Sequence, residues 1–352
     1  MLNYESALQA LNSVDNDCVT PVIERSTLLK IAHDTAAQKM AERPSLLSAY
    51  LTGSVAANEP LLGEATDIDL ILIDAAPPPA REVVKLADQV VLDVQYRSRD
   101  EYAHPKELRV HPWRGPELCE PVFLKDPRHF FELAQSSARG QFHRPDHVAA
   151  RARAFLALAR AELHLSALPG AEPSAPVTLA NFCLALMYTA NAAMTLTGFP
   201  GAGRRLVMKL ETAARKLNQP AVYADFMAIF GGELPAAQAQ LLLADWSAAY
   251  QAGQTADDEL IHPARRTVYE RGFKALIDAD RAAEMEWLLL YTWQAVMRHL
   301  PGNSLHAENW IAFLERLRLA APVEFRARVA EARAYLEQVD ALVENWADQN
   351  GA

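Results

Sequence analysis

The sequence predicts an α+β protein in which a small mixed β-sheet domain is followed by an all-α helical domain. Three segments read as strands, at 48–52, 67–73 and 89–96, lie within the first hundred residues, and the second of them is rich in β-branched residues. From about residue 145 onward, apolar residues recur with helical spacing and no convincing strand pattern is found. Glycine is only 14 of 352 residues, which also favours helix.

The composition is that of a folded protein, since 51% of the residues are hydrophobic and 22% are charged. The length suggests roughly two domains. We expect an α/β domain over 1–142 and a helical domain over 143–352, in which a break near Gly253 would separate two lobes.

Both parts of the chain are acidic. The formal net charge is −10, and residues 1–145 hold 15 Lys and Arg against 21 Asp and Glu, so they carry −6 and the remainder carries −4. A protein that coats duplex nucleic acid needs the opposite charge. We therefore expect no duplex nucleic acid among the partners.

The three cysteines, Cys18, Cys119 and Cys183, lie far apart and form no CxxC pair. This disfavours a disulfide framework and a zinc ribbon, and it indicates a reducing compartment. The N-terminus lacks the basic and apolar regions of a signal peptide. The longest apolar stretch, at 287–296, is too short to span a bilayer. A cytoplasmic location with no membrane partner is expected.

The first domain is predicted to open with helices at 5–13 and 21–42, the second one capped by Thr20 and begun by Pro21. Residues 80–88 are expected to form a short helix after three prolines. The expected strands are 48–52, 67–73, 89–96 and a weaker one at 121–125.

Helical patterns follow one another in the second domain, separated by Gly and Pro breakers. The most linker-like stretch is 168–176, and the aromatic segment at 287–296 is expected to be a buried helix. The predicted helices cover 146–167, 177–197, 203–217, 221–230, 235–251, 257–279, 281–299, 303–319 and 322–347.

Two acids in the second strand carry the clearest chemical signal. Asp67 and Asp69 are two residues apart, so both carboxylates project to one face while Ile68 and Leu70 point into a core on the other. Carboxylates this close repel each other unless a cation neutralises them. Mg²⁺ is the ion usually held by one or two carboxylates together with substrate phosphates.

Two further features complete the candidate site. Asp93 lies within an apolar strand, where a carboxylate is expensive to bury without a partner or a metal ion. If this strand neighbours the strand of Asp67, all three acids converge. Gly53 and Ser54 end the first strand, where a small residue, a hydroxyl and backbone N–H groups suit a phosphate.

These residues together resemble the nucleotidyltransferase superfamily of the DNA polymerase β type. Its pattern is an apolar residue, Gly, then Gly or Ser, a short spacer, and Asp-apolar-Asp or Glu. Here Gly53-Ser54 is followed by twelve residues and then Asp67-Ile68-Asp69. The resemblance covers about residues 45–96. It implies that Asp67, Asp69 and Asp93 are catalytic metal ligands, that Asp93 helps to activate the acceptor hydroxyl, and that Gly53 and Ser54 bind the nucleotide phosphates.

The resemblance also implies a mechanism. Two Mg²⁺ ions would clamp the attacking and leaving oxygens of an in-line displacement. A nucleoside monophosphate would pass from an NTP to an acceptor hydroxyl, and pyrophosphate would leave. Catalysis would then consist mainly of positioning and charge stabilisation.

The segment Met194–Phe230 is similar to the helical domain of the kanamycin and other aminoglycoside nucleotidyltransferases. In that family a Glu on the first long helix of this domain is a general base. The resemblance places this catalytic role on Glu162, although the family's Lys one turn further on is Ser166 here. It also implies a homodimer.

Arg204, Arg205 and Lys209 lie within two turns of a predicted helix start. Cations at a helix N-terminus oppose the helix dipole, which indicates that an anion lies nearby. We expect them to face the nucleotide triphosphate, and a solvated basic helix face is the alternative.

The sequence therefore predicts a Mg²⁺-dependent nucleotidyltransferase that uses an NTP and a small-molecule, aminoglycoside-like hydroxyl acceptor. One alternative is a regulatory enzyme that AMPylates a hydroxyl of a partner protein, although the long helical domain argues against it. The other is a non-catalytic nucleotide-binding module of the same fold. The sequence does not name the acceptor or the base.

Overall fold

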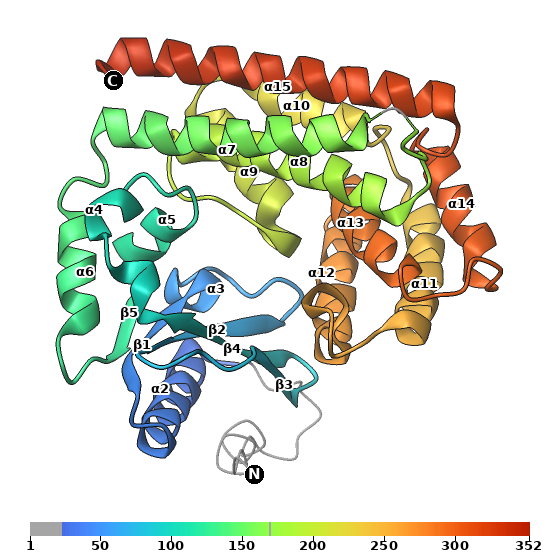
Figure 1. Cartoon of the computed structure of the whole chain (residues 1–352). Coiled ribbons are helices and arrows are strands. Elements are labelled where there is room, and N and C mark those ends of the chain that lie inside the picture. Colours follow the sequence, from blue (N-terminus) through green and yellow to red (C-terminus); the bar gives the residue numbers. More distant parts are fainter. Residues whose placement is uncertain (1–22, 169) are drawn as a thin grey trace. The chain divides into compact units, whose positions relative to one another are not determined.

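The computed structural model describes residues 23–168 and 170–352 and shows an α+β protein with one mixed β-sheet and many helices (Figure 1). The predicted helix at 5–13, the Thr20 cap and Cys18 lie outside the described residues. The chain divides into two compact units. The first comprises the described residues up to Arg109, with Arg114–Phe142 and Thr267–Gly272, and the second holds the rest.

The first unit is built on a five-stranded sheet with the strand order β3-β4-β2-β1-β5. Strands β2 and β4 are parallel and every other neighbouring pair is antiparallel. All four predicted strands are present. The strands are β1 (Leu46–Thr52), β2 (Thr66–Asp74), β3 (Glu82–Ala87), β4 (Val90–Ser98) and β5 (Val122–Lys125).

The expected helix at 80–88 is wrong, because these residues form the edge strand β3. A two-residue turn at Asp88 and Gln89 joins β3 to β4, and Val83 lies opposite Asp93 in the antiparallel pair. The β-branched side chains of Val83 and Val84 suit a pleated surface better than a helix. Pairing with β4 then decides between the two conformations.

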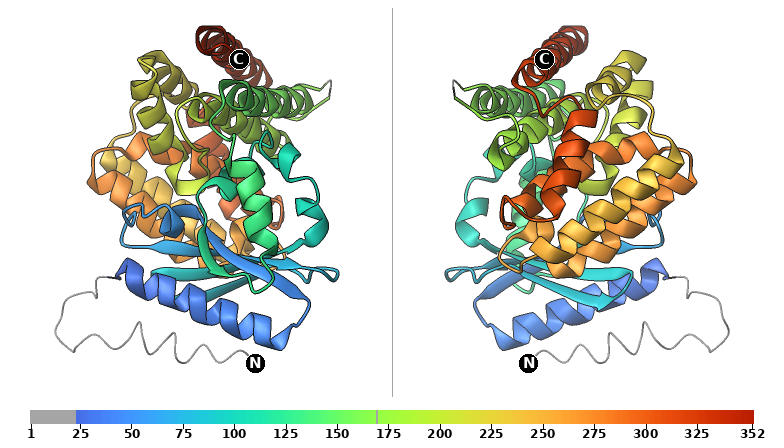
Figure 2. Two further views of the ribbon diagram at one scale, coloured as in Figure 1. Left: turned by 90° about the vertical axis from the view of Figure 1, so that its left-hand side faces the viewer. Right: turned by 90° about the vertical axis from the view of Figure 1, so that its right-hand side faces the viewer.

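One face of the sheet is covered by α2 (Arg25–Glu42), which runs along it in Figure 2. Ile68, Leu70 and Leu72 of β2 pack into the core on this face, as predicted for the first two. Residues 23 and 24 precede the helix, so it begins four residues later than expected.

An apolar cluster packs against one end of the opposite face of the sheet. Tyr50, Ile71 and Ile73 pack there against residues of three short helices that the sequence did not predict. Because side chains alternate along β2, Asp67 and Asp69 lie on this same face at the other end of the strand. The helices are α4 (Pro105–Leu108), α5 (Arg114–Cys119) and α6 (Phe130–Arg139).

The second unit is helical, and no strand occurs among its described residues, as expected. Helices α7, α8 and α15 pack against one another (Figure 1). Residues on both sides of Gly253 belong to this unit. Its helices are α7 (Pro145–Ser166), α8 (Pro176–Thr195), α9 (Leu206–Lys216), α10 (Pro220–Ile229), α11 (Ala236–Gly253), α12 (Arg266–Asp278, partly in the first unit), α13 (Glu286–Met297), α14 (His306–Arg316) and α15 (Pro322–Asn350).

The helix expected at 257–279 is wrong in its first third. Two 3₁₀ turns, Glu259–Ile261 and Pro263–Arg265, precede α12, which begins only at Arg266. His262 between them is extended, with φ −61° and ψ 136°. A residue that precedes proline is driven out of the helical region by the proline ring, so Pro263 separates the two turns.

Two apolar helices form the interior of the second unit. Helix α13 contains the buried Trp287 and Trp293, which confirms the predicted buried helix. Helix α8 is long and apolar enough to cross a membrane by length and composition, and 72% of that stretch is buried in the protein. A core helix has the same properties.

Glu286 is a carboxylic acid buried completely at the first turn of α13. Arg316 Nε donates a hydrogen bond to Glu286 Oε1 at 2.9 Å. Burial raises the pKa of Glu286 from 4.5 to about 7, and the opposing attraction of Arg316 and Arg328 is too weak to prevent it. The side chain therefore titrates near neutral pH in the folded protein.

This pKa predicts a pH-dependent stability. Between pH 4.5 and 7 the folded chain retains a proton that the unfolded chain has lost, so the stability falls as the pH rises through this window and is constant above it. Relative to a Glu286→Gln variant, the wild-type free energy of unfolding should fall by on the order of 2–3 kcal/mol from pH 5 to pH 8. Denaturant titrations of both proteins at the two pH values test this. An equal difference at both values would contradict it.

Candidate functional site

Three aspartates lie on the same sheet face as the apolar cluster, at the opposite end of that face. Asp67 and Asp69 of β2 are both partly exposed. In the register of the sheet, Asp69 lies between Thr52 of β1 and Asp93 of β4. Residues paired in register project to the same face, so Asp93 lies beside Asp69. Strands β2 and β4 are therefore neighbours, which is the condition that the sequence analysis set for the three acids to converge.

Gly53 lies directly against Asp69. Its φ is +73°, a conformation that side chains with a Cβ rarely adopt. A Cβ built on Gly53 would lie 2.0 Å from Asp69 Oδ2 and 2.9 Å from Asp69 Cγ. Only glycine lets the backbone after β1 approach the carboxylate so closely. The Gly-Ser turn and the acids thus form one arrangement.

The turn that contains Gly53 and Ser54 is a single helical turn, α3 (Gly53–Ala56), held on both sides. Arg25 donates from Nε to the Val55 carbonyl at 2.9 Å and from Nη2 to the Ala56 carbonyl at 3.0 Å. The hydroxyl of Ser54 lies 3.3 Å from that of Thr66, at the start of β2. These contacts fix the turn to α2 and to the strand that carries the acids.

Arg81 is a site residue that sequence reasoning missed. Its Nε donates to Asp93 Oδ1 at 2.6 Å and its Nη2 donates to Asp93 Oδ2 at 2.5 Å, so both carboxylate oxygens are engaged. The Asp93 side chain is completely buried, and this ion pair supplies the partner that a buried acid needs. Arg81 precedes Val83 by two residues, so assigning 82–87 to a strand would have placed it on the same face as Asp93.

The three acids do not form a ready metal-ligand group. Within residues 23–168 and 170–352, no three His, Cys, Asp or Glu side chains are placed to hold a metal ion together. The expected convergence of Asp67, Asp69 and Asp93 is met in strand register but not as a ligand cluster, and Arg81 binds the third acid. Asp67 and Asp69 alone still offer the hard oxygen donors that Mg²⁺ accepts when phosphates complete its shell.

A largely buried polar network lies beside the apolar cluster, at the other end of the same face from the acids. Arg97 of β4 donates to the Tyr50 hydroxyl at 3.0 Å, and it forms an ion pair with Glu117 of α5. Burial alone would raise the pKa of Glu117, but Arg97 and Arg114 outweigh it and the pKa is lowered. The pKa of Tyr50 is raised well above its usual value, chiefly by burial and then by Tyr102. The network joins β1, β4 and α5 rigidly.

The other predicted site residues belong to the second unit. Glu162 lies on α7, and burial raises the pKa of its carboxyl group. The pKa of Tyr188 on α8 is also raised, first by burial and then by the charge of Glu162, which places the two side chains near each other. A carboxyl with a raised pKa is suited to accepting a proton.

The predicted basic residues lie on one short segment of the second unit. Arg204 and Arg205 form the 3₁₀ turn Gly203–Arg205, and Lys209 follows in α9. A completely buried side chain fixes the preceding loop: Asn191 accepts from Gly201 N at 2.7 Å and donates to Gly201 O at 3.0 Å. The loop that precedes the three basic residues is therefore held in place by hydrogen bonds. That these residues bind a triphosphate remains a prediction.

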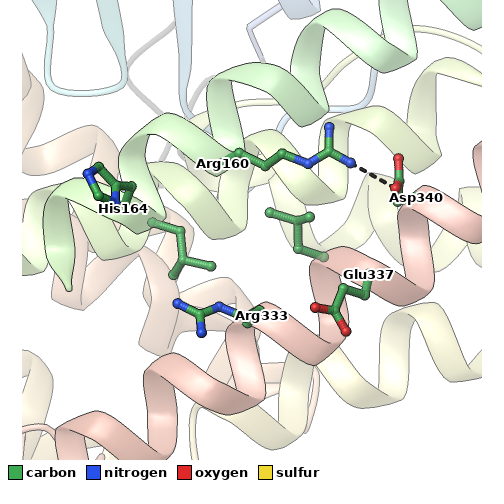
Figure 3. Close-up of a pocket in the computed structure, with 7 residues that line it drawn as sticks. Arg160, His164, Arg333, Glu337 and Asp340 are labelled. Carbon is green, nitrogen blue, oxygen red and sulfur yellow. Dashed lines mark ion pairs between the residues drawn. The ribbon is translucent and has the colours of Figure 1, made fainter.

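A separate groove lies between α7 and α15 in the second unit (Figure 3). Its volume is about 410 Å³, with Leu163 and Leu336 among its lining residues. An ion pair of 2.8 Å joins Arg160 to Asp340 across it. None of the predicted site residues lines this groove.

Comparison with models of known protein families gives no match for this chain, and comparison with curated protein sequences gives no significant match either.

The contact of Gly53 with Asp69 predicts a strong effect of Gly53→Ala. Backbone strain should cost about 1–2 kcal/mol and the collision about 1–3 kcal/mol more in the free energy of unfolding. In an Asp69→Ala background the collision is removed, so the same glycine substitution should cost only the strain. Denaturant unfolding of the four proteins in this cycle measures both parts. Equal losses in the two backgrounds would show that Gly53 and Asp69 are not in contact.

Proposed function

We propose that the protein is a Mg²⁺-dependent nucleotidyltransferase that moves a nucleoside monophosphate from an NTP to a hydroxyl acceptor. The observation that carries this proposal is the close packing of Gly53 on Asp69, with Asp67 on the same face of β2 and Asp93 in register beside it. A glycine turn held against paired carboxylates brings phosphate-binding backbone and metal-binding oxygens to one place.

The residues fit Mg²⁺. Asp67 and Asp69 would hold it by carboxylate oxygens, and substrate phosphates would complete the coordination. Bound there, Mg²⁺ would supply Lewis-acid stabilisation of charge on the phosphoryl oxygens.

The protein's own groups would position the reactants. The backbone and hydroxyl of Gly53 and Ser54 would bind phosphate oxygens, and the contacts from Arg25 to α3 would keep this turn in place. Asp93 would orient the acceptor hydroxyl. This role requires the ion pair to open, because two hydrogen bonds from Arg81 occupy both carboxylate oxygens of Asp93.

Further proposed roles fall on residues of the second unit. Glu162, with a pKa raised by burial, would accept a proton from the acceptor hydroxyl. Arg204, Arg205 and Lys209 would bind the triphosphate. A small-molecule acceptor of the aminoglycoside type suits the net charge of −10, because a polycation is attracted to an acidic protein.

A non-catalytic nucleotide-binding module is the second candidate, and one observation favours it. Both oxygens of Asp93 are occupied by Arg81 in a completely buried ion pair. A third acid held in this way does not contribute to transfer unless the pair opens. Nucleotide binding without pyrophosphate release would identify this function, and AMP transfer to a protein hydroxyl would identify the regulatory alternative.

The proposal predicts stabilisation by a nucleotide only when Mg²⁺ is present. At about 100 times the Kd, ATP, GTP, CTP or UTP should stabilise the fold by about 2.7 kcal/mol, which raises the Tm by a few degrees. The shift should be lost in Asp67→Asn/Asp69→Asn, because the carboxylates that hold the cation are gone. Thermal unfolding with each nucleotide, with and without Mg²⁺, measures it.

Asp278→Asn/Asp280→Asn is the matched control for this experiment. These two acids have the same spacing, are exposed and belong to the second unit, so the control makes the same change in charge outside the unit that holds the sheet. It should retain the full shift. The absence of a shift with every nucleotide in the wild-type protein would reject the transferase, and a shift that survives in the Asp67/Asp69 variant would place the nucleotide elsewhere.

A further inference from the structure

The bond between Arg81 and Asp93 differs from an ordinary structural ion pair in its position. Asp93 lies beside Asp69 in the register of the sheet, so two carboxylates share one end of the face. Like charges at this spacing attract a cation strongly. Arg81 supplies a single positive charge to Asp93, and it does so through both oxygens at 2.6 and 2.5 Å.

The position of Arg81 in the chain allows its side chain to move away from Asp93. Arg81 comes directly before β3, which is an edge strand with only one neighbour, and its side chain is 29% exposed. The residues before it, Pro77–Ala80, are exposed and lie outside any helix or strand, and Arg43 Nη2 donates to the Pro77 carbonyl at 2.9 Å. Prolines have no N–H group to join a sheet ladder, so this segment does not anchor the arginine to a further strand.

Asp93 has no such freedom. It lies in the middle of β4 between two paired strands, and its side chain is completely buried. Removing one partner of a buried ion pair is strongly destabilising, so exchange of the arginine for another cation is favoured over its simple loss. A divalent ion bound by the neighbouring acids is the cation that this position favours.

We propose that Arg81 is a positioning residue that competes with a divalent cation for Asp93. In the ligand-free protein the guanidinium neutralises Asp93 and keeps its carboxylate aimed at the face that carries Asp69. When Mg²⁺ and a nucleotide bind, Asp93 exchanges the guanidinium for the ion, and Arg81 is released towards the phosphates, which its planar donors suit. This inference rests on the proposed function, since it requires a nucleotide-dependent cation at Asp67 and Asp69.

The test is the Mg²⁺ concentration that gives half of the nucleotide-induced rise in Tm, measured with the NTP that stabilises the wild-type protein most. In Arg81→Gln the competing cation is gone, so this concentration should fall about tenfold, a change of about 1.4 kcal/mol in binding. The Tm without ligand should also fall, because Asp93 is then buried without its arginine. A purely structural partner would lower the Tm but leave the Mg²⁺ requirement unchanged.

The chain offers a matched control. Arg43 also forms an ion pair with a completely buried aspartate, Asp74, at the far end of β2 and on the opposite face of the sheet. Arg43→Gln should lower the Tm as Arg81→Gln does, but it should leave the Mg²⁺ requirement at the wild-type value. Arg81→Lys keeps the charge without the two-pronged bond, so it should fold even where Arg81→Gln does not, and its Mg²⁺ requirement should lie below that of the wild type.

A double-mutant cycle with Asp93→Asn separates the possible results. If the exchange occurs, removing Arg81 has no effect on the Mg²⁺ requirement once Asp93 is neutral. An unchanged requirement in both Arg81 variants, beside a wild-type protein that responds to Mg²⁺ and nucleotide, would overturn the exchange and leave the proposed function standing. A wild-type protein that shows no response to any nucleotide would overturn both.

Discussion

The structure of the first unit depends on where its sheet places negative charge. The parallel register of β2 and β4 sets Asp69 beside Asp93, and strand alternation adds Asp67 to the same face. Carboxylates this close repel one another, so compensating cations stabilise the arrangement. Arg81 forms an ion pair with Asp93, and the proposed Mg²⁺ would bind Asp67 and Asp69.

The rest of the same sheet face shows how this concentration of charge is supported. Beyond the acids, the face turns apolar at Ile71 and Ile73, and three short helices cover it. The network of Arg97, Tyr50 and Glu117 lies within this apolar end and is joined by hydrogen bonds. A polar network that is satisfied and buried is rigid. The acids are therefore carried by strands whose other end is fixed, which suits a site that works by positioning.

The second unit also holds its charged residues in fixed positions, but it does so with a loop and a helix instead of a sheet. Its basic segment begins in a loop, where a backbone would otherwise be mobile, and a buried Asn191 side chain bonds both the N–H and the C=O of Gly201. Glu162 instead lies on a long regular helix beside Tyr188. Charged groups of both signs are thus held by elements that packing has already ordered, and the burial of Glu162 adjusts its affinity for a proton.

The sequence by itself determined the features that depend on neighbouring residues. Alternation along one strand was enough to place Asp67 and Asp69 on one face and Ile68 and Leu70 in the core, and helical periodicity was enough to identify the second unit. Only the tertiary structure decided that β4 lies beside β2 in this register, since pairing depends on segments far apart in the chain. It also decided that residues expected to form a helix at 80–88 form an edge strand, because pairing with β4 outweighs a weak local preference for helix. Arg81 therefore could not be assigned to Asp93 from local pattern, since their contact exists only once that strand has formed.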